Sequence, residues 1–156
     1  MSATVDANVL VHASDSSSPF HTRALGLLGQ LAMGPEPVYV FWPVAMAYLQ
    51  IVTDEAVFDH PLTRQQAKEN LEDLLGNPNV LAVGEEDAFW EAYGPTAAHV
   101  FLQGDFVALG YLVGLMRQHG VSTIWTHDRD FRQYPGIVVR NPYEDLTPAG
   151  SRPAAG

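Results

Sequence analysis

Short apolar runs alternate with segments of helical pattern along the chain, and this alternation constrains the fold more than any other feature. Buried strands are expected at residues 3–5, 38–41, 80–83, 122–125 and 137–140. Helices are expected at about residues 20–33, 44–52, 63–75, 86–98 and 105–119. The resulting βαβα order favours a mostly parallel sheet of about five strands with helices on both faces, a three-layer α/β/α sandwich.

Residues with strong positional preferences mark several helix ends. Pro43 suits the first turn of a helix, where its missing N–H is not needed. Thr63 and Gln66 have the spacing of a capping box. Gly120 is the type of residue that ends a helix at its C-terminus.

The length of 156 residues predicts one domain over residues 1–146, followed by a flexible tail, rich in Pro, Ala and Gly, at 147–156. Hydrophobic residues make up 47% of the chain and charged residues 17%, which disfavours disorder in the domain. No apolar run approaches the ~18 residues of a membrane helix, and the first residues do not resemble a signal peptide. The absence of cysteine excludes disulfides and zinc–thiolate sites, and it fits a cytoplasmic protein.

The net charge of −10 argues against a protein that holds nucleic acid by bulk electrostatic attraction. A nuclease with a local basic rim around an acidic site remains compatible with this charge. A basic protein partner would also be attracted to such a surface.

Carboxylates follow two of the expected strands. Asp6 comes directly after the strand at residues 3–5, and Asp128 and Asp130 follow the strand at 122–125. If the two strands are parallel neighbours, Asp6 and Asp128 meet at the carboxyl edge of the sheet, where open α/β sheets bind ligands. Carboxylates that converge without a lysine repel one another, and a hard cation such as Mg²⁺ relieves the repulsion.

Each of these residues also has a structural interpretation. Asp6 could cap a helix that begins near Val9, and Asn8 could hold Asp6 or simply stand in a turn. Asp130 could stabilise a first helical turn through the helix dipole. Arg129 could pair with a carboxylate or contact a phosphate, and His127 could carry a proton or be merely packed or exposed.

Several segments together resemble the PIN-domain ribonucleases, and within them the VapC-type toxins of toxin–antitoxin pairs. The resemblance covers about residues 4–143. It rests on Val-Asp-Ala-Asn-Val-Leu at 5–10, Trp-Pro-Val at 42–44 leading to Tyr-Leu-Gln-Ile-Val-Thr at 48–53, and Arg-Gln-His-Gly at 117–120. The most specific stretch is Trp-Thr-His-Asp-Arg-Asp-Phe at 125–131, followed by Pro-Gly at 135–136.

The resemblance implies RNA cleavage at an acidic pocket that holds Mg²⁺ or Mn²⁺. Asp6 and Asp128 match the first and last acidic residues of the family, with Asp130 alongside and Asn8 as the small polar residue after the first Asp. The expected catalytic residues are therefore Asp6, Asp128 and Asp130. Asn8 and Arg129 are expected to position the substrate.

Two acidic positions of the family are not matched. Ala47 stands where the family usually has a Glu, and Leu109 stands where it has an Asp. Asp105 lies one helical turn upstream of Leu109, so it could join Asp6 and Asp128 as a metal ligand or only cap its helix, and we favour the cap. The remaining carboxylates suffice for one Mg²⁺ with its waters.

These departures leave two functions from different classes open. One is a VapC-like endoribonuclease, and the other is a degenerate PIN domain that binds a protein or an RNA without cutting. A phosphoryl-accepting domain is disfavoured, because that chemistry normally uses a lysine at a later strand end and the only lysine is Lys68, inside an expected helix.

The resemblance also implies two protein partners. One is an antitoxin whose C-terminal segment covers the pocket, and the other is a second copy of the chain. Apolar residues within 41–52, including Trp42, Met46 and Tyr48, could form the face of a homodimer or belong to the core. We favour the core, because helices in such sandwiches bury one face.

Overall fold

The computed structural model describes residues 1–99 and 103–144, with side chains described through residue 96 and again from 103. The tail expected at residues 147–156 lies outside these ranges, so that expectation stays a prediction. In chain order the elements are β1 (Ala3–Val5), α1 (Ala7–Ser14), α2 (His21–Met33), β2 (Val38–Phe41), α3 (Trp42–Val52), α4 (Arg64–Leu75), β3 (Val80–Val83), α5 (Phe89–His99), α6 (Phe106–Gln118), β4 (Thr123–Trp125), the 3₁₀ helix η1 (Arg129–Gln133) and β5 (Val138–Arg140).

The five strands form one sheet in the order β3-β2-β1-β4-β5, and every neighbouring pair is parallel. The chain starts at the centre of the sheet, builds one half with β2 and β3, and then crosses to the other side of β1 to add β4 and β5. The expected parallel α/β sandwich is therefore confirmed. The reversal of strand order at β1 and β4 makes their carboxyl ends the switch point, the usual ligand site of such sheets.

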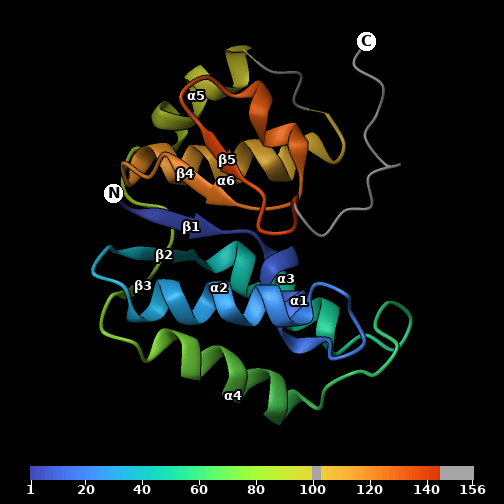
Figure 1. Cartoon of the computed structure of the whole chain (residues 1–156). Helices are drawn as coiled ribbons and strands as arrows, with labels where there is room; N and C mark the ends of the chain where they lie inside the picture. Colours follow the sequence, from blue (N-terminus) through green and yellow to red (C-terminus); the bar gives the residue numbers. More distant parts are fainter. Residues whose placement is uncertain (100–102, 145–156) are drawn as a thin grey trace.

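Helices cover both faces of the sheet (Figure 1). In that view α2 passes in front of the sheet, and α5 lies at the opposite end of the molecule from α4. The central strands are buried on both sides, with Val5, Val40 and Ile124 fully inaccessible to solvent. Their apolar side chains explain why these short segments need no alternation of polar and apolar residues.

The expected helix ends are largely correct. Thr63 and Gln66 form both hydrogen bonds of the capping box of α4. Gly120 follows α6 with a φ of 68°, a left-handed conformation in which glycine has no steric penalty. Helix α5 begins at Phe89 instead of residue 86, because Ala88 has a φ of 64° and interrupts the helical backbone just before it.

Across the described ranges, no helix has both the length and the apolar character needed to cross a membrane.

Candidate active site

Asp6 lies at the switch point of the sheet. Its backbone N–H donates to the carbonyl oxygen of Trp125 at 3.0 Å, which extends the pairing of β1 and β4 by one residue. It also stands at the N-cap of α1, and its Oδ1 accepts the N–H of Ala7 at 2.8 Å. The capping interpretation of Asp6 is thus correct, and Oδ2 is left to face the residues that follow β4.

Thr126 connects these residues through one hydroxyl group. The residue is fully buried, and its Oγ1 donates to Asp6 Oδ2 at 2.9 Å. The same oxygen accepts Asn8 Nδ2 at 2.9 Å and the backbone N–H of Asp128 at 2.9 Å. One threonine therefore fixes Asp6, Asn8 and Asp128 relative to one another.

Thr126 is the functional residue that sequence reasoning missed. A usable signal was present, since a hydroxyl residue directly after a buried strand and two residues before an Asp can accept the backbone N–H of that Asp.

Asn8 holds Asp6, as one of its two interpretations proposed. Its Nδ2 donates to Asp6 Oδ2 at 3.0 Å as well as to Thr126. Its Oδ1 is buried and has no hydrogen-bond partner. An unpaired buried carbonyl oxygen is costly, so this atom marks a position suited to a donor or a cation.

Asp128 is half-buried at the start of η1, and its Oδ1 accepts the backbone N–H of Asp130 at 2.9 Å. The side chains of Arg129 and Asp130 are exposed. The structure therefore brings Asp6, Asn8 and Asp128 together, whereas Arg129 and Asp130 stand at the solvent side of the same segment.

The electrostatics of the Asp6 and Asp128 carboxylates favour the binding of a cation. Burial raises the pKa of the Asp6 carboxyl and outweighs the hydrogen bonds from Thr126 and Ala7, which lower it. The negative charge of Asp128 raises the pKa of Asp6 further, while His127 lowers it slightly. Ionised Asp6 is therefore desolvated and close to a like charge, and a divalent cation relieves both penalties.

The remaining expected ligand does not join this pair. Asp105 is exposed, and although it stands at the N-cap position of α6, its backbone is helical and its side chain makes no capping hydrogen bond. The favoured capping role of Asp105 is thus wrong. Among the residues that the structure describes, no three His, Asp or Glu side chains are grouped to hold a metal.

The donors that are present fit one Mg²⁺ better than two. The fit rests on the carboxylates of Asp6 and Asp128 and on the unpaired Oδ1 of Asn8 beside them. Mg²⁺ commonly uses one or two carboxylates and keeps several waters. Ala47 and Leu109 add no ligand, and Leu109 packs partly buried against the core.

Aromatic rings border the acidic site. The exposed His127 ring lies 5.7 Å from that of His12 and 6.1 Å from that of Tyr143, measured between centroids. Phe20 stacks on Tyr143 at 4.4 Å. His127 is thus an exposed ring within an aromatic cluster, and no hydrogen bond ties it to Asp6 or Asp128.

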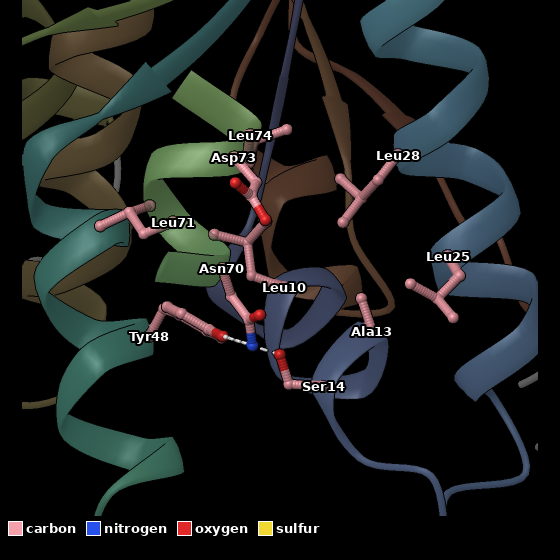
Figure 2. Close-up of a pocket in the computed structure, with 10 residues that line it drawn as sticks. All are labelled: Leu10, Ala13, Ser14, Leu25, Leu28, Tyr48, Asn70, Leu71, Asp73 and Leu74. Atoms are coloured by element: carbon pink, nitrogen blue, oxygen red, sulfur yellow. Dashed lines mark hydrogen bonds between the residues drawn. The ribbon is translucent and has the colours of Figure 1, made fainter. Parts of the chain in front are cut away.

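A separate cavity of about 210 Å³ lies among α1, α2, α3 and α4 and is lined mainly by leucines (Figure 2). At its floor the hydroxyl of Tyr48, a buried residue, is 2.7 Å from Ser14 Oγ and accepts Asn70 Nδ2 at 3.3 Å. Neither Asp6 nor Asp128 lines this cavity.

The apolar residues of α3 divide between core and surface. Tyr48 is buried, but Trp42 is 43% exposed and Met46 is 52% exposed. The expectation that this set belongs to the core is therefore wrong for Trp42 and Met46. One helical turn separates them, so they lie on the same side of α3.

Comparison with known proteins gives close relatives. The ribonuclease VapC48 of Mycobacterium tuberculosis is 46% identical, over 92% of this chain and 99% of its own length. No protein-family model matches the chain.

Two solved structures share the fold. VapBC2 of Rickettsia felis, bound to a DNA fragment from its promoter, superposes with a TM-score of 0.63 at 14% identity, covering 90% of this chain and 98% of its own. VapC20 of Mycobacterium tuberculosis, a toxin that cleaves the sarcin–ricin loop, also gives 0.63 at 14% identity, covering 89% and 99%.

Proposed function

Because the chain belongs to the VapC family of PIN-domain ribonucleases, we propose that it is a metal-dependent endoribonuclease toxin with its site at Asp6 and Asp128. The observation that carries this proposal is the Thr126 hydroxyl, which joins Asp6, Asn8 and Asp128 at the switch point. This hydroxyl orients the Asp6 carboxylate and fixes the backbone of Asp128 beside it, and a bound cation would stabilise the two like charges. We also propose that the protein works in the cytoplasm, which agrees with RNA as its substrate.

Asp6 and Asp128 would hold Mg²⁺ or Mn²⁺. When bound, the cation supplies Lewis-acid activation for hydrolysis of the RNA phosphodiester. Thr126 and Asn8 fix the orientation of the Asp6 carboxylate, and the Asp130 N–H fixes that of Asp128. Arg129 is exposed and next to Asp128 in the chain, and we propose that it contacts a phosphate of the RNA, with Asp130 beside it.

The test is RNA cleavage by purified protein with Mg²⁺ or Mn²⁺. Wild type should cut structured RNAs, and Asp6→Asn should reduce the rate at least about a hundredfold, as expected when a metal ligand is lost. Asp59→Asn is the matched control, because Asp59 is an exposed aspartate outside the site. Intact RNA in the wild-type reaction, beside a positive control that cuts, would contradict the proposal.

A second candidate is a PIN domain that binds without cutting. It is favoured by Ala47 and Leu109 and by the lack of a third acidic ligand within the described ranges. In that case Asp6→Asn changes neither toxicity nor binding. Growth arrest on expression that requires Asp6 excludes this candidate.

An antitoxin of the VapB type is the proposed protein partner. The structure from Rickettsia felis contains both members of such a pair, and the net charge of −10 suits a basic partner. We place a basic side chain of the antitoxin over Asp6 and Asp128, and its apolar residues in the leucine-lined cavity of Figure 2.

Co-expression tests the placement of the antitoxin. The cognate antitoxin should restore growth of cells that express the wild-type chain. Leu25→Asp places a charge in the cavity wall at a residue that is 48% exposed, so it should abolish the rescue and leave the toxicity itself unchanged. Full rescue of the Leu25→Asp variant would place the antitoxin elsewhere.

The second proposed partner is another copy of the chain. Trp42 and Met46 present an exposed apolar surface on α3, and exposed aromatic and Met side chains are enriched in protein interfaces. We propose that this surface forms a homodimer.

A further inference from the structure

We propose that a groove between α2 and the strands β4 and β5 binds the single-stranded RNA that flanks the cleaved bond. The inference rests on the proposed ribonuclease function and adds the path that the substrate takes away from Asp6 and Asp128. The groove has a volume of about 630 Å³. Arg23, Gly26 and Gln30 of α2 form one wall, with Trp125 of β4 and Asn141 beyond β5 opposite them.

The groove adjoins the acidic site through the backbone. Trp125, which lines it, accepts the N–H of Asp6 at 3.0 Å through its carbonyl oxygen. The next residue is Thr126, whose side chain bonds the Asp6 carboxylate and the backbone N–H of Asp128. The N–H of Thr126 donates to the carbonyl of Arg140 at 3.0 Å. The groove therefore adjoins the acidic site, because Trp125 lines the groove and its backbone is hydrogen-bonded directly to Asp6.

The groove has the chemistry of a single-strand site. Trp125 lines the groove, and an indole ring is a surface on which a nucleobase can stack. Arg23 supplies a cation, and Asn141 and Gln30 add hydrogen-bonding groups. A base must be unstacked from its neighbours to use such a platform, which favours single-stranded RNA over a duplex.

Charge distribution supports the same assignment. The chain has 18 acidic and 8 basic residues, but among the residues that the structure describes no Asp or Glu lines this groove. A polyanion is therefore repelled by most of the protein and accepted here. The acidic overall charge thus agrees with an RNA substrate, because the attraction is local.

Gly26 contributes to the groove wall without a side chain, so a larger residue at this position would extend into the groove. Gly26 lies inside α2, where glycine is less favourable than alanine, and a Cβ built on it would have no atom within 4 Å. Gly29 of the same helix has equally open surroundings but does not line the groove. Gly26→Leu is therefore the variant expected to block the groove, and Gly29→Leu is its matched control.

The experiment measures binding of a fluorescein-labelled 12-nucleotide single-stranded RNA by anisotropy, in EDTA so that no cleavage occurs. Wild type, Gly29→Leu and Asp59→Asn should bind with similar affinity. Gly26→Leu and Trp125→Ala should bind at least about fivefold more weakly, the lower end of what one stacked base contributes. Arg23→Ala should also lower the slope of log Kd against log salt by about 0.7, the value for one phosphate contact on a single strand.

Equal binding by Gly26→Leu and wild type would overturn the proposal, as would an absence of binding by the wild-type protein. The result is independent of catalysis. If wild type binds RNA through the groove but never cuts RNA with Mg²⁺ or Mn²⁺, the groove proposal is supported and the nuclease proposal is contradicted. If wild type cuts RNA and Gly26→Leu binds RNA normally, the nuclease proposal is supported and the groove proposal is contradicted.

Discussion

Asp6, the proposed metal ligand, is buried at a cost in stability when its carboxyl is ionised. Burial raises its pKa above the ordinary value of 3.8, so the folded state prefers the protonated carboxyl. The stability that this preference provides is complete below pH 3.8 and is lost as the pH rises through the folded-state pKa. At neutral pH, without metal, ionised Asp6 therefore destabilises the protein.

The first prediction concerns the loss of stability caused by ionised Asp6. In EDTA at pH 7, Asp6→Asn should have a higher Tm than wild type, and the difference should narrow as the pH is lowered toward 4. Added Mg²⁺ should raise the Tm of wild type and not that of the variant. Differential scanning calorimetry makes the comparison, with Asp59→Asn as the exposed control. A lower Tm for Asp6→Asn at pH 7 in EDTA would show that its hydrogen bonds outweigh its charge.

The second prediction concerns Thr126. Thr126→Val keeps the shape of the buried side chain but removes the oxygen that Asp6, Asn8 and Asp128 share. We expect a loss of about 2 kcal/mol in the free energy of unfolding, together with about 10–100-fold weaker metal binding. Thr126→Ser retains the oxygen and should restore most of both. Unchanged metal affinity in Thr126→Val would remove Thr126 from the site.

Sequence reasoning predicted that Asp6 and Asp128 meet at one edge of the sheet, because each follows a buried strand. The sequence also offers a signal for the bond between Thr126 and the N–H of Asp128, because that bond is local. It offers none for the bond between Thr126 and Asp6, which forms only because β1 and β4 are neighbours. For Asp105 the sequence correctly predicted a position at the start of a helix. The capping hydrogen bond expected from its side chain is absent.

At the scale of elements, the sequence predicted where helices begin and end better than which of their residues are buried. The capping box of α4 follows from Thr63 and Gln66 alone, because both hydrogen bonds are local. The start of α5 was three residues early, since nothing in the sequence signals the left-handed backbone of Ala88. The exposure of Trp42 and Met46 depends on which neighbours cover α3, which periodicity does not reveal.

The third prediction tests the capping box. Thr63→Ala should lower the free energy of unfolding by about 1 kcal/mol, because it leaves the Gln66 N–H at the start of α4 without its partner. Chemical denaturation measures the change. Gln50→Ala, at an exposed position of α3, is the control and should stay within about 0.5 kcal/mol of wild type. Equal effects of the two substitutions would mean that the cap adds no stability.

At the scale of the whole molecule, an acidic chain presents three chemically distinct surfaces. The switch point carries the paired carboxylates, the groove beside β4 and β5 carries arginine and tryptophan, and α3 carries Trp42 and Met46. The strand order places the carboxylates at the switch point of the sheet. The proposed substrate site and the proposed self-association surface therefore lie on different elements.

The fourth prediction tests the proposed self-association. Wild type should be a dimer by light scattering after size exclusion, and Trp42→Arg with Met46→Glu should be a monomer with an unchanged far-UV circular dichroism spectrum. Trp90→Arg is the matched control, because Trp90 is 76% exposed but lies on α5. A monomeric wild type, or a dimer that survives the double substitution, would contradict the assignment to α3.

The central claim is that Asp6 and Asp128 form a working metal site without the acidic residues that Ala47 and Leu109 replace. The most direct test is calorimetric titration with Mn²⁺ of wild type, Asp6→Asn and Asp128→Asn, with RNA cleavage assayed on the same samples. We predict one Mn²⁺ per wild-type chain, with binding and cleavage both lost in the two variants. Wild-type protein that binds no Mn²⁺ and leaves RNA intact would contradict the claim.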